Sequence, residues 1–166
     1  MSLSKLTKIM MEYYNDVRFS EHSIKAYAYA RVIAEGESLS DNDKLILNAA
    51  TILHDIGIPL AIKIHGSSKG EYQEAEGAKL VPEMLEKAEI HGITEQVAWL
   101  VGNHHTHELA KNNMLLQILM EADYLVNLAE GKASDEKIRE VLDGFFVTET
   151  GKGYLQGLFG VKRNGE

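Results

Sequence analysis

The stretch that decides the fold is Thr51-Ile52-Leu53-His54-Asp55-Ile56-Gly57, which closes the most apolar segment of the chain. Between Leu45 and this stretch nearly every position is apolar, and Ser40 or Asp41 provides an N-cap for a helix. A helix that is apolar almost all round must be buried, so we expect it at the centre of the molecule. Gly57, followed two residues later by Pro59, predicts where that helix ends.

Two polar side chains, His54 and Asp55, stand at the end of this apolar helix. A carboxylate that leaves water without a partner is costly, and no lysine or arginine lies within one helical turn of Asp55. The nearest basic residue downstream is Lys63. A cation from elsewhere is therefore needed to balance the aspartate.

Three further polar residues occupy positions that should face the interior. Asp123 follows Leu116 and Leu119 on the apolar stripe of a helix that has no basic residue. His104 takes the next inward position after the Val97, Leu100 and Val101 stripe. We expect His22 in the first turn of a helix capped by Ser20, where the helix dipole favours the neutral imidazole that binds metals.

The rest of the chain also predicts helices. It has only two prolines in 166 residues, which argues against a turn-dense β-sandwich. The expected segments are 3–14, 20–36, a Pro82-containing helix over 73–88, one capped by Thr94, 114–129, one capped by Ser134, and a short helix within 145–159. Residues 60–72 are expected to form a loop.

Composition narrows the classes of function. The chain has 17 basic and 25 acidic residues, a net charge of -8, which makes duplex nucleic acid a poor partner but allows a small anionic substrate. It has no cysteine, so any transition metal must be held by nitrogen and oxygen. No apolar run approaches a membrane span and no signal peptide is evident, so we expect a cytoplasmic protein without a membrane partner.

Each inward polar residue has a simpler explanation when it is taken alone. A lone inward histidine is usually a hydrogen-bonded core residue, and Asp123 could pair with a distant arginine. Four helices that each present a histidine or carboxylate are better explained together. One divalent cation would neutralise the aspartates and use neutral imidazoles as ligands.

The order His22, His54-Asp55, Asp123, with the contexts Leu53 to Gly57 and Glu121-Ala122-Asp123, resembles the HD domain superfamily of metal-dependent phosphohydrolases. The resemblance covers about residues 20–130. It implies an all-α helical bundle with a divalent metal at its centre, bound by His22, His54, Asp55 and Asp123. We expect a single domain over 1–166, with residues 131–166 as a helical extension. The metal would be Mn, Fe, Co, Ni, Zn or Mg.

Members of that superfamily with two metals carry additional histidines, which this chain matches in part. His104 resembles one of them, and His105 is a second possible ligand. The other, expected before Gly77-Ala78, is missing, so a second metal would have to use Glu74 or Glu76, or do without. This departure counts against two-metal chemistry and against a diiron oxygenase.

The resemblance implies hydrolysis of a phosphate ester, with a nucleotide or another small ester as substrate. The metal would polarise a phosphoryl oxygen and activate water, Asp55 would orient that water, and His104 would carry a proton if it does not bind metal. Phosphate would contact the loop 63–70 through Lys63, Ser67, Ser68 and Lys69, although that loop could equally be a solvated surface.

Two other functions remain open at this point. A non-catalytic, metal-stabilised or ligand-sensing helical module would bind metal and turn over nothing. A plain helical bundle, whose polar core residues satisfy one another, would bind no metal. A homodimer is expected on general grounds alone.

Overall fold

The computed structural model describes residues 3–162 of the 166-residue chain, and within that range it has ten helices and no strand. The predicted all-α class is therefore confirmed, while the ends of the predicted domain 1–166 lie outside the described residues. The helices are α1 (Leu3–Tyr14), α2 (Val17–Gly36), α3 (Asp41–Leu53), α4 (Ile58–His65), α5 (Gly70–Lys87), α6 (Thr94–Val101), α7 (His107–Ala110), α8 (Met114–Glu130), α9 (Asp135–Gly144) and α10 (Glu149–Phe159).

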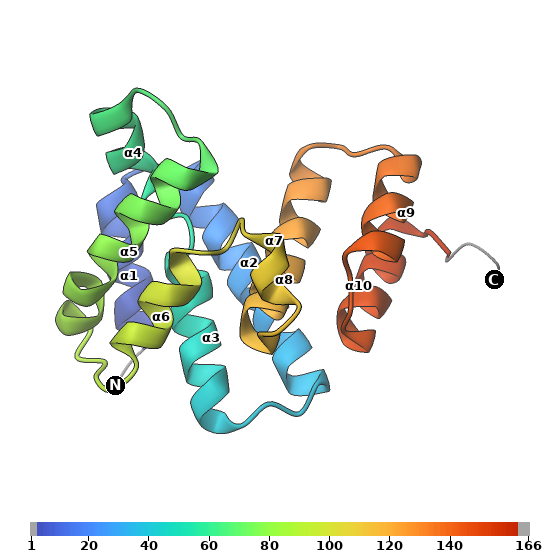
Figure 1. Ribbon diagram of the computed structural model, residues 1–166, viewed down its shortest axis with the longest axis horizontal. Coiled ribbons are helices and arrows are strands. Elements are labelled where there is room, and N and C mark those ends of the chain that lie inside the picture. Colours follow the sequence, from blue (N-terminus) through green and yellow to red (C-terminus); the bar gives the residue numbers. More distant parts are fainter. Residues whose placement is uncertain (1–2, 163–166) are drawn as a thin grey trace.

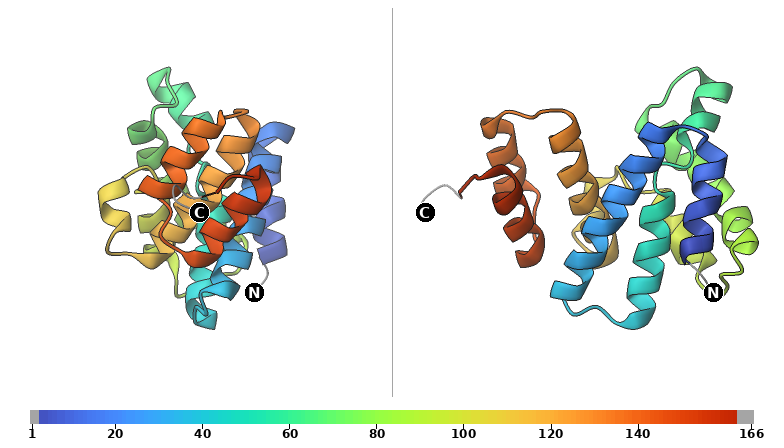
Figure 2. Two further views of the ribbon diagram at one scale, coloured as in Figure 1. Left: turned by 90° about the vertical axis from the view of Figure 1, so that its right-hand side faces the viewer. Right: turned by 180° about the vertical axis from the view of Figure 1, so that it is seen from behind.

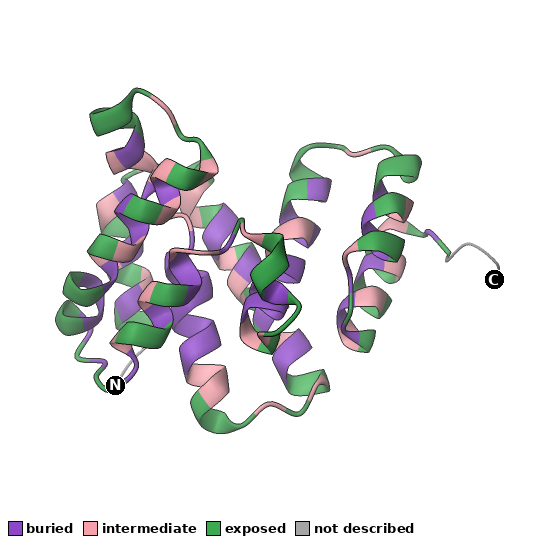
Figure 3. Ribbon diagram, in the orientation of Figure 1, coloured by how far each residue is buried: buried purple, intermediate pink, exposed green. Residues whose placement is uncertain are grey.

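Helix α2 lies between α3 on one side and α8 on the other (Figures 1 and 2). Helices α1 and α6 pack against α3, α5 packs against α1 and α6, and α9 and α10 form the opposite end of the molecule next to α8. Figure 3 shows that the buried positions lie mainly where helices face one another. The core therefore runs through the bundle, and α2, α3 and α8 form its centre.

The apolar helix is α3, and it is as buried as its sequence predicts. Every residue from Ile46 to Leu53 is buried, and the Ser40 side chain accepts a hydrogen bond from the Asp43 amide at the N-terminus. After Leu53 the chain makes a tight turn over residues 54–57 before α4 begins. A Cβ atom on Gly57 would collide with the backbone of Gln73 and Gly77 in α5. Glycine is therefore required where α5 crosses this turn.

The expected loop over residues 60–72 is wrong, because most of it is helical. Helix α4 occupies 58–65, ends in a left-handed Gly66, and leaves only residues 66–69 between itself and α5. Its exposed side includes Ile62 and Ile64, so its apolar residues do not mark one buried stripe. That distribution explains why the pattern did not predict a helix.

Two predicted helix starts also differ from the structure. Asp16, and not Ser20, caps α2 by accepting from the Arg18 amide, and the Ser20 hydroxyl donates to the Asp16 carbonyl instead. Ile93 occupies the N-cap position of α6 without a side-chain hydrogen bond, so Thr94 is the first residue of that helix and not its cap. The cap of α8 is Asn113, which is one of the two expected residues.

Helices α9 and α10 are attached to the bundle through a buried carboxylate. Glu121 of α8 is fully buried and accepts hydrogen bonds from the amides of Val147 and Thr148 and from the Thr148 hydroxyl. The Gln117 side chain donates to the same carboxylate at 2.9 Å. These bonds fix the start of α10 against the helix that also carries Asp123.

No single helix among residues 3–162 is long and apolar enough to cross a membrane. Helices α3 and α4 meet these two criteria only when they are taken together, and the pair is bent by 43°.

Candidate metal centre

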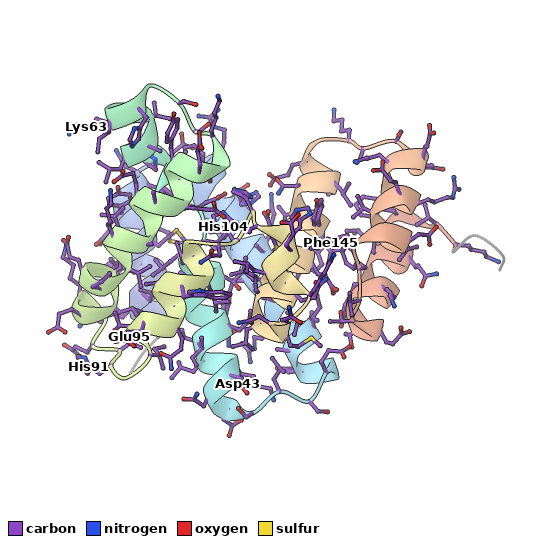
Figure 4. The ribbon with its side chains drawn as sticks, viewed as in Figure 1. Asp43, Lys63, His91, Glu95, His104 and Phe145 are labelled. Carbon is purple, nitrogen blue, oxygen red and sulfur yellow. The ribbon has the colours of Figure 1, made fainter. Side chains whose placement is uncertain are left out.

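Four parts of the fold bring the predicted residues together. Helix α2 supplies His22, the turn after α3 supplies His54 and Asp55, the turn after α6 supplies His104, and α8 supplies Asp123. The side chains of His54 and His104 have no exposed surface, and those of Asp55 and Asp123 are 15% and 14% exposed. The inward orientation predicted from the helical spacing is therefore present, and Figure 4 shows His104 between α6 and α8.

His22, His54 and Asp123 form one group whose ligand atoms all lie within 4.8 Å of one another. Oδ1 of Asp123 is 3.0 Å from Nε2 of His22 and 3.5 Å from Nε2 of His54. One carboxylate oxygen thus faces two imidazole nitrogens, which is the kind of ligand set that a transition metal binds.

Asp55, His104 and His105 form a second such group, also within 4.8 Å. Oδ1 of Asp55 is 3.5 Å from Nε2 of His104, while Oδ2 is 3.5 Å from Nε2 of His22 and 3.4 Å from Nε2 of His54. The Asp55 carboxylate therefore lies between the two groups and faces one with each oxygen.

Backbone carbonyls fix the orientation of His54 and His104. Nδ1 of His54 is 2.8 Å from the Thr51 carbonyl, and Nδ1 of His104 is 2.7 Å from the Val101 carbonyl. A carbonyl only accepts, so Nδ1 carries the proton and Nε2 of the neutral ring presents its lone pair to the centre. Both Nε2 atoms are buried without a hydrogen-bond partner among the described residues. Lone pairs that face carboxylates need a positive charge between them, and a divalent cation fits this requirement.

In the protein without a cation, protons supply that charge. Burial opposes charging of His54, but Asp55 and Asp123 outweigh it and raise its pKa to about 9. The pKa of His22 is also raised, against its own desolvation, by hydrogen bonding to Asp123. Burial acts to raise the pKa values of Asp55 and Asp123, and the histidines around them overcome it and lower both. The site therefore attracts positive charge strongly.

His22 lies in the second turn of α2, because the helix starts at Val17. The expected effect of the helix dipole on its protonation is therefore wrong, since that effect is confined to the first turn. Instead, Nδ1 of His22 is 3.1 Å from Oε2 of Glu130, at the end of α8. This partner was missed in the sequence, although it follows Asp123 by seven residues, or two helical turns.

Of the candidate ligands for a second metal, His105 and Glu74 lie at the second group and Glu76 does not. Desolvation, followed by the neighbouring His104, lowers the pKa of His105 to about 4, which keeps its ring neutral and able to bind a metal. Oε1 of Glu74 accepts a hydrogen bond from the His105 amide at 2.7 Å. Glu76 instead contacts Lys79 at 2.9 Å and His65 at 3.1 Å, outside both groups. Glu74 thus borders the second group, and Glu76 is engaged elsewhere.

Only some of the predicted phosphate-contacting residues lie in the connection before α5, next to the centre. A Cβ atom on Gly70 would lie 2.9 Å from the ring of His105, so the start of α5, with Lys69 as its N-cap, adjoins the centre. Ser67 and Ser68 lie in the same short connection, where the Ser67 hydroxyl accepts from the Lys69 amide. Lys63 stands on α4, far from His104 in Figure 4. The expectation that Lys63 belongs to this loop is therefore wrong.

An open cavity of about 280 Å³ gives access to the centre. His22 and Asp55 form part of its wall, and Arg18, Phe19, Asn127 and Glu130 form the rest. Arg18 was not predicted as a functional residue, but it precedes His22 by four residues and so shares its face of α2. The cavity combines one guanidinium and one aromatic ring with two of the candidate metal ligands.

The sequence model of the HD domain matches residues 19–128, which is well over half of the chain. The protein therefore belongs to the HD domain family, as the resemblance predicted. HD domains bind divalent metals, and the buried histidine and aspartate cluster could hold such an ion. Neither the curated proteins nor the solved structures include a match to the chain.

Proposed function

We propose that this protein is a metal-dependent phosphohydrolase that acts on a nucleotide or another small phosphate ester. The observation that carries the proposal is that the buried Nε2 atoms of His54 and His104, which face different oxygens of the Asp55 carboxylate, have no hydrogen-bond partner within residues 3–162. Unsatisfied buried polar atoms are rare in folded proteins. Their convergence on aspartates supports a site for divalent cations, which is the centre of hydrolytic HD domains.

The bound cation would supply the positive charge that polarises a phosphoryl oxygen and makes a water molecule more acidic. His22, His54, Asp55 and Asp123 would hold it, with His104 and His105 available to a second ion. Asp55 accepts a hydrogen bond from the attacking water and fixes its direction. When only the first group is occupied, Nε2 of His104 takes a proton from that water or returns one to the leaving oxygen.

Two features around the centre support binding of a phosphate group. Arg18 reaches the cavity from α2, and a guanidinium matches two phosphate oxygens. On the His105 side, α5 begins at Gly70, and no side chain in the described part of the chain caps its first amides. Free amides at a helix N-terminus bind anions. Together, these groups offset the net charge of -8 near the substrate.

The test is hydrolysis by protein purified without chelator and without affinity metal, then loaded with Mn²⁺ or Zn²⁺. A panel of nucleotides and small phosphate esters should include at least one that is hydrolysed, with release of inorganic phosphate. Asp55→Ala should abolish the reaction, whereas Glu108→Gln, which removes an exposed carboxylate from α7, should leave it unchanged.

Metal bound in stoichiometric amount without turnover of any ester would overturn the hydrolase and favour a ligand-sensing module. Absence of metal after loading would overturn the metal site as well.

A further inference from the structure

His22 differs from the other two buried histidines in what holds its outer nitrogen. His54 and His104 each use a backbone carbonyl three residues earlier in the same segment. In His22 the outer nitrogen contacts Glu130, a side chain on another helix and 108 positions away in the chain. The orientation of this imidazole therefore depends on a residue that can be replaced.

Glu130 is itself held at both carboxylate oxygens. Oε2 lies 3.1 Å from Nδ1 of His22, and Oε1 accepts from Nζ of Lys25 at 3.1 Å. Lys25 belongs to the same helix as His22, one turn further on. The carboxylate is 41% exposed, but these two contacts fix its plane against α2.

Helix α8 contacts the His22 ring at both nitrogens. Asp123 faces Nε2 at 3.0 Å and Glu130 faces Nδ1 at 3.1 Å. Glu130 only accepts when it is ionised, so once a cation takes the place of the proton that Asp123 attracts to Nε2, Glu130 selects the ring form that has a proton on Nδ1. That form directs the Nε2 lone pair toward the group formed by His54 and Asp123.

We propose that Glu130 is a positioning residue that sets the affinity of the centre for its metal through His22. The proposal rests on the metal site argued above, and it assigns no contact between Glu130 and the metal. A carboxylate behind a metal-binding imidazole holds the ring and increases its basicity, and loss of such a partner typically lowers metal affinity about 10- to 100-fold. Lys25 supports Glu130 from the other side.

Positioning of His22 predicts that loss of Glu130 lowers metal affinity but not the stability of the metal-free fold, whereas a merely structural role predicts a loss of stability. Ion pairs on the surface, such as Lys25 with Glu130, contribute little to folding, so removal of Glu130 should barely change the melting temperature of the metal-free protein. Metal affinity should fall strongly at the same time. The two measurements together separate positioning of His22 from support of the fold.

The experiment is a titration with Mn²⁺ alone, monitored by isothermal calorimetry, on the full chain. Glu130→Ala should lower the affinity about 10- to 100-fold. Glu130→Gln keeps an acceptor but loses the charge, so its affinity for Mn²⁺ should lie between those of Glu130→Ala and the wild type. The matched control is Glu21→Gln, because Glu21 also faces Lys25, at 3.7 Å, and no hydrogen bond or ion pair joins it to His22 within residues 3–162.

Each outcome decides the proposal. Equal affinities of wild type and Glu130→Ala would overturn it and leave the hydrolase untouched. An equal loss in Glu21→Gln would also overturn it, since general charge would then be the cause. Reduced affinity in the Glu130 variants alone would support it, even if no phosphate ester were ever hydrolysed. No Mn²⁺ binding by the wild type would overturn both proposals.

Discussion

Nε2 of His104 faces Oδ1 of Asp55 at 3.5 Å, and this nitrogen has no hydrogen-bond partner among the described residues. The other oxygen of the same carboxylate faces His22 and His54. One aspartate therefore connects two groups of candidate ligands. This relationship explains why Asp55 should be the least replaceable residue of the centre.

Substitution of Asp55 and Asp123 should have different effects on metal content. Asp55→Asn removes the carboxylate charge from both groups, so we expect the purified protein to lose all bound metal. Asp123 belongs only to the group with His22 and His54, so Asp123→Asn should spare any ion held by Asp55, His104 and His105. Elemental analysis of metal equivalents per chain checks both variants. Full metal content in Asp55→Asn would contradict the assigned centre.

The stability of the metal-free protein should depend on pH in a defined direction. The pKa of His54 is raised from 6.5 to about 9, so its contribution is complete below pH 6.5 and is lost as the pH rises to about 9. Melting in the presence of a chelator should show a decrease on the order of 10 °C across that interval. The lowered pKa values of Asp55 and Asp123 act oppositely, because their contribution is lost only in acid.

Mn²⁺ provides the control for this pH dependence. A bound cation replaces the protons on the imidazoles, so the loaded protein should lose less stability between pH 6.5 and 9. His54→Asn in chelator should weaken the alkaline decrease. Identical pH profiles for the wild type with chelator and for His54→Asn would show that His54 is not the group responsible.

The central residues could be predicted because a polar side chain on an apolar stripe is conspicuous. His54, Asp55, His104 and Asp123 all stand where helical spacing places core residues, and the structure brings them together. Glu130 was missed because it is partly exposed at a helix end, where a glutamate is unremarkable. Its role depends on how α8 lies against α2, which no local pattern encodes.

The environment of His22 shows the same limit at the level of a helix start. Both Asp16 and Ser20 are good N-cap residues, and the sequence alone favoured the serine. The structure uses Asp16, which adds one turn to α2 and moves His22 away from the helix dipole. Its inward orientation was predictable, whereas the cause of its protonation behaviour depends on contacts from α8.

The turn that carries His54 and Asp55 should be intolerant of a side chain at Gly57. The added methyl group of Gly57→Ala would meet the Gln73 carbonyl and the Gly77 amide, which are backbone atoms and cannot rotate away. We expect a loss of about 2–4 kcal/mol in the free energy of unfolding, measured with urea. Gly153→Ala in α10 is the control, because its methyl group would enter open space and should stabilise the helix slightly. Equal stabilities would refute the close approach.

The C-terminal helices should loosen when Glu121 is removed. Glu121→Ala leaves the amides of Val147 and Thr148 without their acceptor, at a cost of about 1–3 kcal/mol for each unsatisfied group. Hydrogen exchange should become faster in residues 145–159 and stay slow in α3. Glu140→Gln, an exposed residue paired with Lys137 at 3.0 Å, should leave exchange unchanged. Protection of α10 in Glu121→Ala would mean that other contacts hold it.

Lys69 and Lys63 offer a direct test of where phosphate binds. Lys69 caps α5 beside His105, whereas Lys63 is on the outer part of α4, so only the first is near the centre. If a phosphate ester is hydrolysed, Lys69→Ala should raise KM about 10-fold with little change in kcat, because one charged contact to the substrate is lost. Inhibition by inorganic phosphate should weaken in parallel. Lys63→Ala should behave like the wild type in both assays. An unchanged KM in Lys69→Ala would exclude the start of α5 as the phosphate contact and leave Arg18, which lines the cavity with His22 and Asp55, as the cation that binds the substrate.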